Sequence, residues 1–177
     1  FGIVSALFLL NGRKQGQMLR SGFATSIGTP EADIRTDWLY GGATLWRRDV
    51  IATYDYDEWY IGHGFLEDVD YSYRVSRSYE LWVIAGARVW HWPHPILKSK
   101  NISLGMQQVV NRFYFARKMG SFSMPALIWA IFGQCILNGL NAIRSRSSDG
   151  LLRLVGNIKG IGRILTGRSG SVDGVWK

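Results

Sequence analysis

Apolar residues are grouped differently in the first and last parts of the chain. Residues 1–10 form an apolar run that ends at Asn11-Gly12, which predicts a buried strand followed by a turn. The run lacks the basic leader and cleavage site of a signal peptide, and a chain that opens inside a core strand is expected to be a fragment. Residues 13–35 are rich in glycine, serine, threonine and charge, which predicts a long loop of the kind that often carries function.

The middle of the chain combines turn and helix signals. Residues 38–46 are predicted to form a turn with a short strand, and residues 47–51 to begin a short helix. Over residues 66–76 the acids come first and Arg74 follows, which agrees with the dipole of a helix. The apolar face of this helix is formed by Phe65, Val69 and Tyr73.

Strand and helix signals follow in turn over the next forty residues. Residues 81–85 and 88–92 are rich in β-branched and aromatic residues around Gly86, and both are predicted as strands. Residues 102–118 have the spacing of an amphipathic helix. Strands mixed with helices predict an α/β domain followed by C-terminal helices. The basic face of the 102–118 helix is formed by Arg112, Arg117 and Lys118.

Residues 124–143 form a long apolar segment between Lys118 and Arg144 that carries no charge. About 20 apolar residues are enough to span a bilayer, but amides and a glycine interrupt this segment. The flanking cations favour an interfacial helix at an anionic membrane, while a true span and a soluble core helix stay open as alternatives. Residues 151–168 repeat the basic amphipathic pattern, and residues 169–177 are expected to be a flexible tail.

Composition indicates a folded chain with an anionic partner. The 177 residues are 47% hydrophobic and 14% aromatic, enough for one domain with a core. The net charge of +8 is uneven, because beyond Arg88 only Asp149 and Asp173 oppose a long series of lysines and arginines. Such asymmetry indicates lipid headgroups, a phosphorylated substrate or nucleic acid as partner. The single Cys135 excludes an internal disulfide.

Residues suited to chemistry are concentrated in four motifs between Asp37 and Val75. The motifs are Asp37-Trp38-Leu39-Tyr40-Gly41-Gly42, Trp46-Arg47-Arg48-Asp49-Val50, Tyr56-Asp57-Glu58 and Glu67-Asp68-Val69-Asp70-Tyr71-Ser72-Tyr73-Arg74-Val75. Their order and spacing resemble the C-terminal half of the catalytic domain of family-2 glycosyltransferases, over roughly residues 1–118.

The resemblance implies a partial GT-A fold, a Rossmann-like α/β nucleotide-diphospho-sugar transferase domain that lacks its N-terminal half. The implied activity transfers a sugar from a nucleotide-sugar donor to an acceptor hydroxyl, in polysaccharide or lipid-linked glycan synthesis. Residues 1–118 would then belong to the catalytic domain and residues 119–168 to a membrane-associated helical tail at the cytoplasmic face. Because the donor-binding half is missing, the isolated segment is expected to be inactive.

The resemblance gives Asp68 the role of the base that accepts the proton of the acceptor hydroxyl, with Glu67 as the less favoured candidate. Two adjacent carboxylates repel each other, which raises the pKa of one of them toward a useful value. The alternative is that both acids only begin a helix and pair with nearby arginines. The candidate arginines for such pairs are Arg47, Arg48 and Arg74.

Aromatic, glycine and arginine residues are expected to bind the substrate. An aromatic face stacks on the C–H groups of a sugar, glycine lets backbone amides approach a ligand, and arginine compensates a diphosphate. Core packing is the alternative for Trp38, and pairing with acids is the alternative for the arginines. The expected set is Trp38, Gly41, Gly42, Arg47, Arg48 and Arg74.

The resemblance also implies a divalent metal, Mg²⁺ or Mn²⁺, whose main ligands lie in an Asp-X-Asp motif outside this chain. His91 follows the last predicted strand, where the resemblance places a histidine that contacts the metal or the diphosphate. His94 is the second candidate. Lys98 and Lys100 follow on a loop that is able to close over the diphosphate, with a solvated loop as the alternative.

A non-catalytic module that docks on membranes or binds nucleic acid is the competing function, because of the +8 charge. The cations cluster with apolar residues rather than in a polar groove, so no nucleic-acid partner is expected. Glu67 and Asp68 are too close together for a glycosidase, whose two carboxylates lie about 5 Å or more apart. The expected partners are a nucleotide-sugar donor, a glycan or lipid-linked acceptor and the membrane surface.

Overall fold

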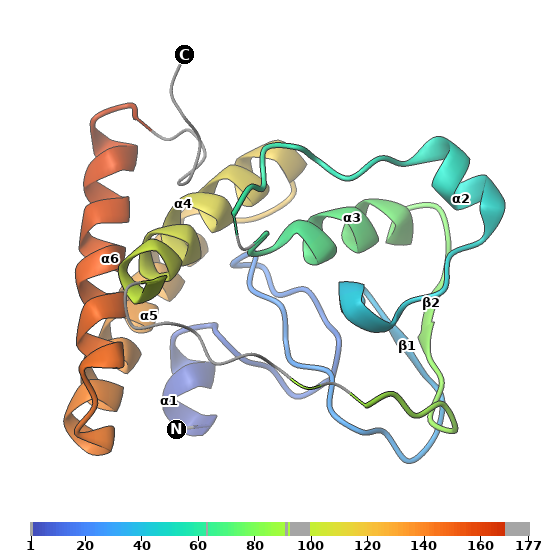
Figure 1. Cartoon of the computed structure of the whole chain (residues 1–177), viewed down its shortest axis with the longest axis horizontal. Helices are drawn as coiled ribbons and strands as arrows, with labels where there is room; N and C mark the ends of the chain where they lie inside the picture. Colours follow the sequence, from blue (N-terminus) through green and yellow to red (C-terminus); the bar gives the residue numbers. More distant parts are fainter. Residues whose placement is uncertain (1, 63, 91, 93–99, 169–177) are drawn as a thin grey trace.

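The computed structural model describes residues 2–62, 64–90, 92 and 100–168, and it contains both helices and a small antiparallel sheet. Three long helices and the short N-terminal helix stand at one side, and the sheet with the other short helices stands at the other (Figure 1). In chain order the elements are α1 (Gly2–Leu7), β1 (Ile34–Thr36), the 3-10 helix η1 (Gly41–Ala43), α2 (Arg48–Thr53), α3 (Glu67–Ser76), β2 (Leu81–Val83), α4 (Asn101–Met119), α5 (Met124–Ser145) and α6 (Ser148–Leu165).

Glycines bring α4 and α6 into close contact along their length. A Cβ atom on Gly156 would lie 2.2 Å from the carbonyl oxygen of Ile102, and one on Gly105 would lie 2.2 Å from that of Arg153. The two backbones therefore approach more closely than any larger residue permits at these points. Gly160 continues the same face of α6 one turn later, with Val109 against it.

Buried amides join the three long helices. Asn138 on α5 donates to Asn157 on α6 over 2.6 Å and to Gln108 on α4 over 3.1 Å. Asn157 in turn donates to the carbonyl of Gly105 over 2.8 Å. Because Asn138, Asn157 and Gln108 bond to one another, the three helices are held in one arrangement rather than sliding on an apolar surface.

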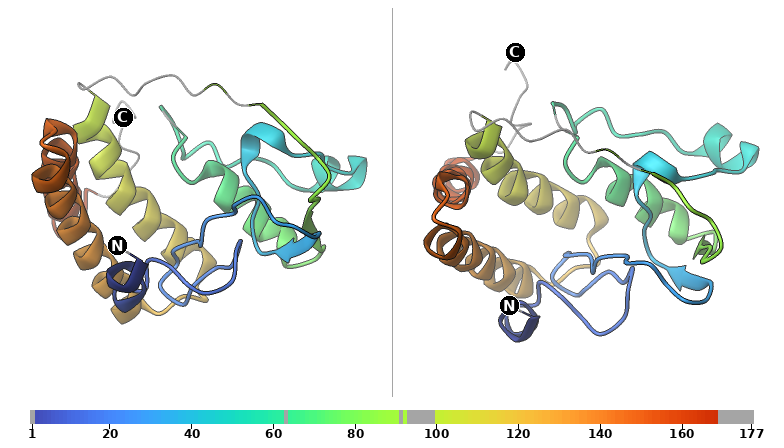
Figure 2. Two further views of the ribbon diagram at one scale, coloured as in Figure 1. Left: turned by 90° about the horizontal axis from the view of Figure 1, so that it is seen from below. Right: turned by 60° about the horizontal axis from the view of Figure 1, so that its bottom comes forward.

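The main apolar cluster crosses residues 118 and 119, where the catalytic part was expected to meet the helical tail. It joins Phe23, Val109 and Ala116 with Leu127 and the residues that follow it on α5. Two further clusters lie around α3, and α4 contributes Phe115 to the first of them. Helix α4 therefore lies between α5 and α6 on one side and α3 on the other, as Figure 2 shows.

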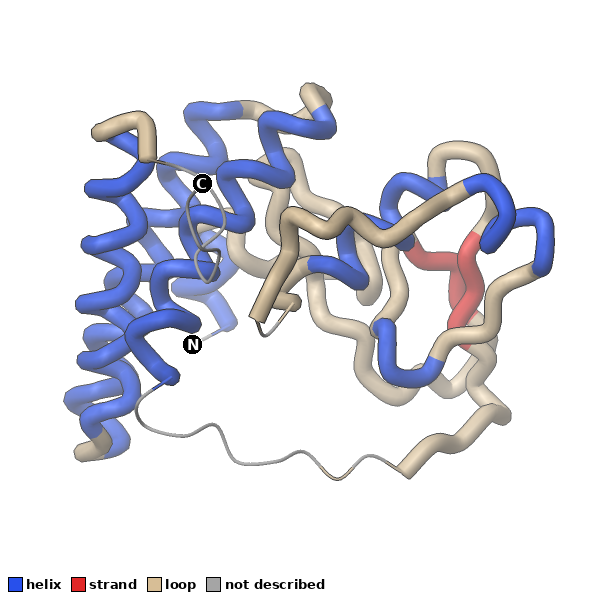
Figure 3. The backbone as a smooth tube through the Cα atoms, turned by 45° about the horizontal axis from the view of Figure 1, so that its top comes forward, coloured by secondary structure: helices blue, strands red, loops and turns tan. Residues whose placement is uncertain are grey.

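The sheet consists of two antiparallel strands of three residues each, which lie far from the long helices (Figure 3). Arg35 is paired with Trp82 at its centre. The expected α/β class is therefore present in its coarse form, as helices combined with a sheet. Among the residues that the structure describes, no parallel or Rossmann-like sheet occurs.

The prediction of a strand at residues 1–10 is wrong, since Gly2–Leu7 is helical. A short apolar run does not distinguish a strand from a buried helix by periodicity alone. Here Phe8 packs its ring against Trp129 and Phe132 of α5, and Gly133 leaves the space for it. The partner of the run is thus a helix rather than a sheet.

The second strand prediction, at residues 88–92, is also wrong for the residues described there. Strand β1 is only three residues long, so the ladder ends where Ile34 pairs with Val83. Just beyond, the amide of Ala85 donates to Asp33 Oδ1 over 2.8 Å instead of to another strand. The predicted turn at 38–46 is present, but it contains η1 in place of the short strand.

The helices predicted over 47–51, 66–76, 102–118, 124–143 and 151–168 are confirmed as α2 to α6, with small shifts at their ends. One detail of the 102–118 prediction is wrong. Arg112 is buried, so it does not belong to a basic face that is open to solvent. The predicted tail at 169–177 lies outside the described residues.

Candidate functional site

The acid pair lies at the first turn of α3, where the backbone changes direction sharply. Gly64 and Leu66 both have positive φ angles, of 61° and 77°, so the chain turns into the helix through two left-handed residues. The amide of Glu67 donates to the carbonyl of Gly64 over 2.8 Å and closes this turn. The carboxylates of Glu67 and Asp68 therefore stand at the positive end of the helix dipole.

The glycine turn contacts Asp68 directly. The amide of Gly41 donates to Asp68 Oδ2 over 3.3 Å. Two residues earlier, the amide of Leu39 donates to Ser72 Oγ over 3.0 Å, one helical turn after Asp68. The amides of Leu39 and Gly41 thus bind two successive turns of α3. These contacts bring together two motifs that lie 27 positions apart in the sequence.

Space explains why a glycine suits position 41. A Cβ atom there would lie 3.2 Å from the Cβ of Asp68, which is tighter than ordinary contact. At Gly42 a Cβ would have no neighbour within 4 Å. Of the two glycines in the motif, only Gly41 is therefore constrained by the acid pair.

Aromatic rings surround the acid pair on one side. Tyr56 is 47% exposed and stacks on Tyr71 with ring centroids 4.2 Å apart. Burial, then Tyr71 and the two acids, raise the pKa of Tyr56, so its hydroxyl stays protonated near the carboxylates. Burial and the neighbouring charge of Asp68 raise the pKa of Glu67 above its ordinary value. The repulsion expected within the pair is thus present at Glu67.

The third acid of the motif, Asp70, is fully buried and belongs to an ion network. Lys118 Nζ lies 2.8 Å from Asp70 Oδ1 and 2.6 Å from Asp57 Oδ2, and Arg74 Nε lies 2.7 Å from Asp70 Oδ1. Tyr60 Oη also donates to Asp70, over 3.1 Å. The network fixes α3 to α4 two residues beyond the proposed base.

The same network shifts two pKa values. Burial acts to raise the pKa of Asp57, but hydrogen bonds from Lys118, the Trp59 amide and Tyr114 together lower it. Burial and the neighbouring Asp70 carboxylate raise the pKa of Tyr60 far above its ordinary value. The network therefore keeps the Asp57 carboxylate charged and the Tyr60 hydroxyl neutral at physiological pH.

Helix α4 also holds the loop that precedes the acid pair. Asn111 Nδ2 donates to the carbonyl of Phe65 over 2.8 Å.

Arg112 Nη1 donates to the carbonyl of Gly22 over 2.9 Å, and its guanidinium lies 3.8 Å from the ring centroid of Phe23. Burial lowers the pKa of Arg112 to about 9. Among the described residues its Nε has no hydrogen-bond partner, so this cation is buried at a cost.

Two of the expected substrate-binding residues have internal partners. Trp38 is 5% exposed and its Nε1 donates to the carbonyl of Thr25 over 3.1 Å. That position favours the core-packing alternative for Trp38 over stacking on a sugar. Arg74 donates to Asp70 and to the carbonyl of Asp55. It therefore belongs to the ion network and does not pair with Glu67 or Asp68.

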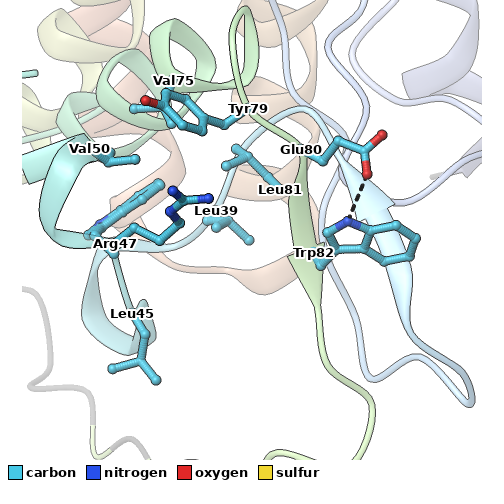
Figure 4. Close-up of a pocket in the computed structure, with 10 residues that line it drawn as sticks. Leu39, Leu45, Arg47, Val50, Val75, Tyr79, Glu80, Leu81 and Trp82 are labelled. Carbon is cyan, nitrogen blue, oxygen red and sulfur yellow. Dashed lines mark hydrogen bonds between the residues drawn. The ribbon is translucent and has the colours of Figure 1, made fainter. Parts of the chain in front are cut away.

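The arginine pair lies beside a different part of the site. Arg47 forms a bidentate pair with Asp49, at 2.9 and 3.1 Å, and lies 5.8 Å from the ring centroid of Tyr79. Figure 4 shows it at a cavity of about 380 Å³ between α2 and β2. Arg48 begins α2 and is exposed. Neither acid of the pair lines this cavity, so the structure does not bring the arginines and the base together.

A second groove, of about 480 Å³, lies between η1 and the end of β2. Its lining includes Tyr40, which precedes Gly41, and Trp82 of β2. None of the described residues that line it is charged. The described residues that line it are Ile27, Gly28, Leu39, Tyr40, Ala43, Thr44, Leu45, Trp82, Val83, Ile84, Ala87 and Val89.

The residues predicted to contact the metal or the diphosphate lie mostly in a part of the chain that the structure does not describe. His91, His94 and Lys98 lie outside the described residues. Within the described part of the chain, no group of three or more histidine, cysteine, aspartate or glutamate side chains is able to hold a metal. Glu67 and Asp68 alone do not make a complete ligand set, because Asp70 is already bound by Lys118 and Arg74.

Sequence reasoning missed Ser72, Tyr56 and the partnership of Asp57 with Lys118. The spacing of Asp70 and Arg74 by four residues was a readable signal for an ion pair on α3. Lys118 is 61 residues from Asp57, and no local pattern indicates that contact.

No protein-family model, no curated protein and no solved structure matches this chain.

Proposed function

We propose that the chain carries the acceptor side of a glycosyltransferase that uses a nucleotide-sugar donor, in a partial GT-A domain. The observation that supports this proposal is the contact between the Gly41 amide and Asp68 Oδ2. It joins the glycine turn and the acid pair, the two motifs on which the resemblance depends. The carboxylates of Glu67 and Asp68 take part in none of the ion pairs found among the described residues.

In the proposed reaction Asp68 is the base. An acceptor hydroxyl attacks the anomeric carbon of the donor sugar and its proton moves to the Asp68 carboxylate. The bond from the acceptor oxygen to the anomeric carbon forms while the bond to the diphosphate oxygen breaks, and the nucleoside diphosphate leaves. Each oxygen of Asp68 accepts one backbone N–H, from Gly41 and Val69, and keeps a lone pair for this proton.

The acceptor is proposed to enter along the uncharged groove that Tyr40 helps to line. Its lining offers aromatic faces and hydroxyl groups but no ion, which suits a neutral glycan or lipid-linked sugar. Donor binding and the divalent metal are assigned to a part of the protein outside this chain, with His91 as the first and His94 as the second candidate contact from here. No step of the mechanism depends on that metal.

The experiment is a transfer assay on the natural protein that contains this chain. Membranes from cells that express it are incubated with labelled nucleotide sugars, and label is followed into lipid-extractable and polymeric products. Transfer from at least one donor, reduced about a hundredfold or more by Asp68→Asn, is expected. The matched control is Asp55→Asn, an exposed acid outside the site, which retains transfer. No transfer from any donor, or equal rates in both variants, contradicts the proposal.

A further inference from the structure

Helix α5 exposes apolar residues in its first turns and again near its end. Ile128 and Phe132 are four residues apart and Leu140 and Ile143 three apart, and Ile143 is 79% exposed. The opposite face packs into the core through Leu127 and Ala130. Only 28% of its most apolar stretch is buried, so α5 is not an enclosed core helix.

Helices α1 and α6, which both contact α5, also expose large apolar residues. Trp129 Nε1 donates to the carbonyl of Leu7, which joins the end of α1 to α5. Helices α5 and α6 both lie on the side of α4 away from α3 (Figure 2). We name the combined face the outer helix surface. Its exposed apolar residues are Ile3 and Leu7 of α1, Ile128, Trp129, Phe132, Leu140 and Ile143 of α5, and Leu151, Ile158 and Leu165 of α6.

Charge indicates what this surface contacts. Residues 100–168 contain ten lysines and arginines and a single acid, Asp149, which accepts a hydrogen bond from Asn101. Cations stand at the C-terminal end of α5, where Arg144 lies in the last turn and Arg146 follows it, and Arg117 and Lys118 lie in the last turn of α4 just before α5 begins. Apolar residues flanked by cations match the boundary between the acyl chains and the anionic headgroups of a bilayer.

The packing of α5 argues against a membrane span. Its inner face shares the amide network of Asn138 and Asn157 and contacts α6, which carries Arg153, Lys159 and Arg163. A spanning α5 would take the charged groups of α6 with it into hydrocarbon, where a charge is costly. A helix that lies flat exposes only its apolar half to lipid.

We infer that the outer helix surface docks flat on an anionic lipid bilayer, with α1, α5 and α6 in the headgroup region and no helix crossing the membrane. This docking is independent of sugar transfer, because it uses a face on the far side of α4 from Asp68. The partner is the lipid surface itself rather than a second protein.

The test is flotation of the 177-residue chain with vesicles of phosphatidylcholine, with and without phosphatidylglycerol, in the absence of any donor. Binding to the anionic vesicles is expected, with weaker binding to neutral ones. Ile128→Glu should reduce binding about tenfold, because an apolar contact is lost and a like charge is added. The matched control is Ile51→Glu on α2, since Ile51 is 59% exposed and Ile128 65%. The control should float as the unchanged chain does.

A second pair of variants tests the cations without touching the apolar contacts. Arg146→Gln and Lys159→Gln, both at exposed positions, should weaken binding to anionic vesicles and leave binding to neutral vesicles unchanged. Circular dichroism confirms that each variant keeps its helices. Release of the bound chain by alkaline carbonate supports a flat position, and resistance to it overturns the inference in favour of a span.

Two further outcomes overturn the inference. If neither vesicle type binds the chain, or if Ile51→Glu and Ile128→Glu behave alike, the outer helix surface is not a lipid contact. If the chain instead forms a dimer that Ile128→Glu dissociates, the surface is an interface between copies. Sugar transfer that persists in Ile128→Glu with soluble acceptors separates a failure here from a failure of the proposed function.

Discussion

The amide of Gly41 donates a hydrogen bond to Asp68 Oδ2 over 3.3 Å, across 27 positions of sequence. The contact joins Gly41, a residue without a side chain, to a carboxylate at the beginning of α3. A Cβ atom at Gly41 would press on the Cβ of Asp68 at 3.2 Å. The position of the proposed base is therefore set from both sides, by α3 and by the turn.

Gly41→Ala should displace Asp68 by a few tenths of an ångström and lower the transfer rate about tenfold, because small misplacements of a catalytic group are costly. Gly42→Ala should have the smaller effect, since nothing lies within 4 Å of a Cβ there. The rates of both variants are compared in the transfer assay. Equal losses in the two variants would show that the turn does not position Asp68.

Asp70→Asn should destabilise the fold by about 3 kcal/mol, because it leaves Lys118 and Arg74 without their buried partner. Urea unfolding followed by circular dichroism measures the change. Asp49→Asn is the control, since its pair with Arg47 is exposed and its loss should be hard to detect. Similar unfolding curves for the two variants would contradict the structural role of the network.

Glu67 should titrate at a higher pH than an ordinary glutamate, because burial and the charge of Asp68 raise its pKa. The raised pKa means that this group stabilises the folded state below its ordinary range and loses that effect as pH rises through the folded pKa. Asp68→Asn should lower the pKa of Glu67, as followed by NMR of the labelled carboxyl carbon. Asp55→Asn should leave it unchanged, and an equal shift in both variants rules out direct coupling.

Arg112→Met should change the free energy of unfolding at pH 7 by no more than about 1 kcal/mol, because a buried unpaired cation adds little net stability. Burial lowers the pKa of Arg112 from its ordinary value to about 9 in the folded state. Between the folded and the unfolded pKa the unfolded chain binds more protons, so the stability of the unchanged protein rises with pH.

The measurement for Arg112 is the difference in unfolding free energy between the unchanged protein and Arg112→Met, taken at pH 8 and at pH 10.5. The difference should move in favour of the unchanged protein at the higher pH. Tyr60 lies near Arg112 and its raised pKa keeps it neutral in the folded state over this range. Its titration in the unfolded chain is common to both proteins and cancels in the difference. A difference that is independent of pH would contradict the buried charge.

The amphipathic helices were predictable from sequence because their signal is local. Val69 and Tyr73 lie on the packed side of α3, as their spacing indicates. The first ten residues were not predictable, because Phe8 packs on residues of α5 more than 120 positions away. The strand expected at 88–92 failed for a similar reason, since its possible partner β1 ends after three residues.

The candidate site was predictable in part. The order of motifs places Gly41 near Asp68, and the structure brings them into contact. An aromatic side chain suits a sugar contact, but Trp38 is buried and its Nε1 donates to the carbonyl of Thr25. No sequence motif indicates this contact. The contacts of Lys118 with Asp57 and Asp70 join distant segments, so they follow from the fold and not from any local pattern.

The most direct test of the account is the rate of sugar transfer by Asp68→Asn, measured beside nucleotide-sugar binding in the natural protein that contains this chain. The substitution keeps the shape of the side chain and removes its capacity to accept a proton. The account predicts that transfer falls about a hundredfold or more while donor binding is unchanged. Transfer at the rate of the unchanged protein would show that Asp68 is not the base.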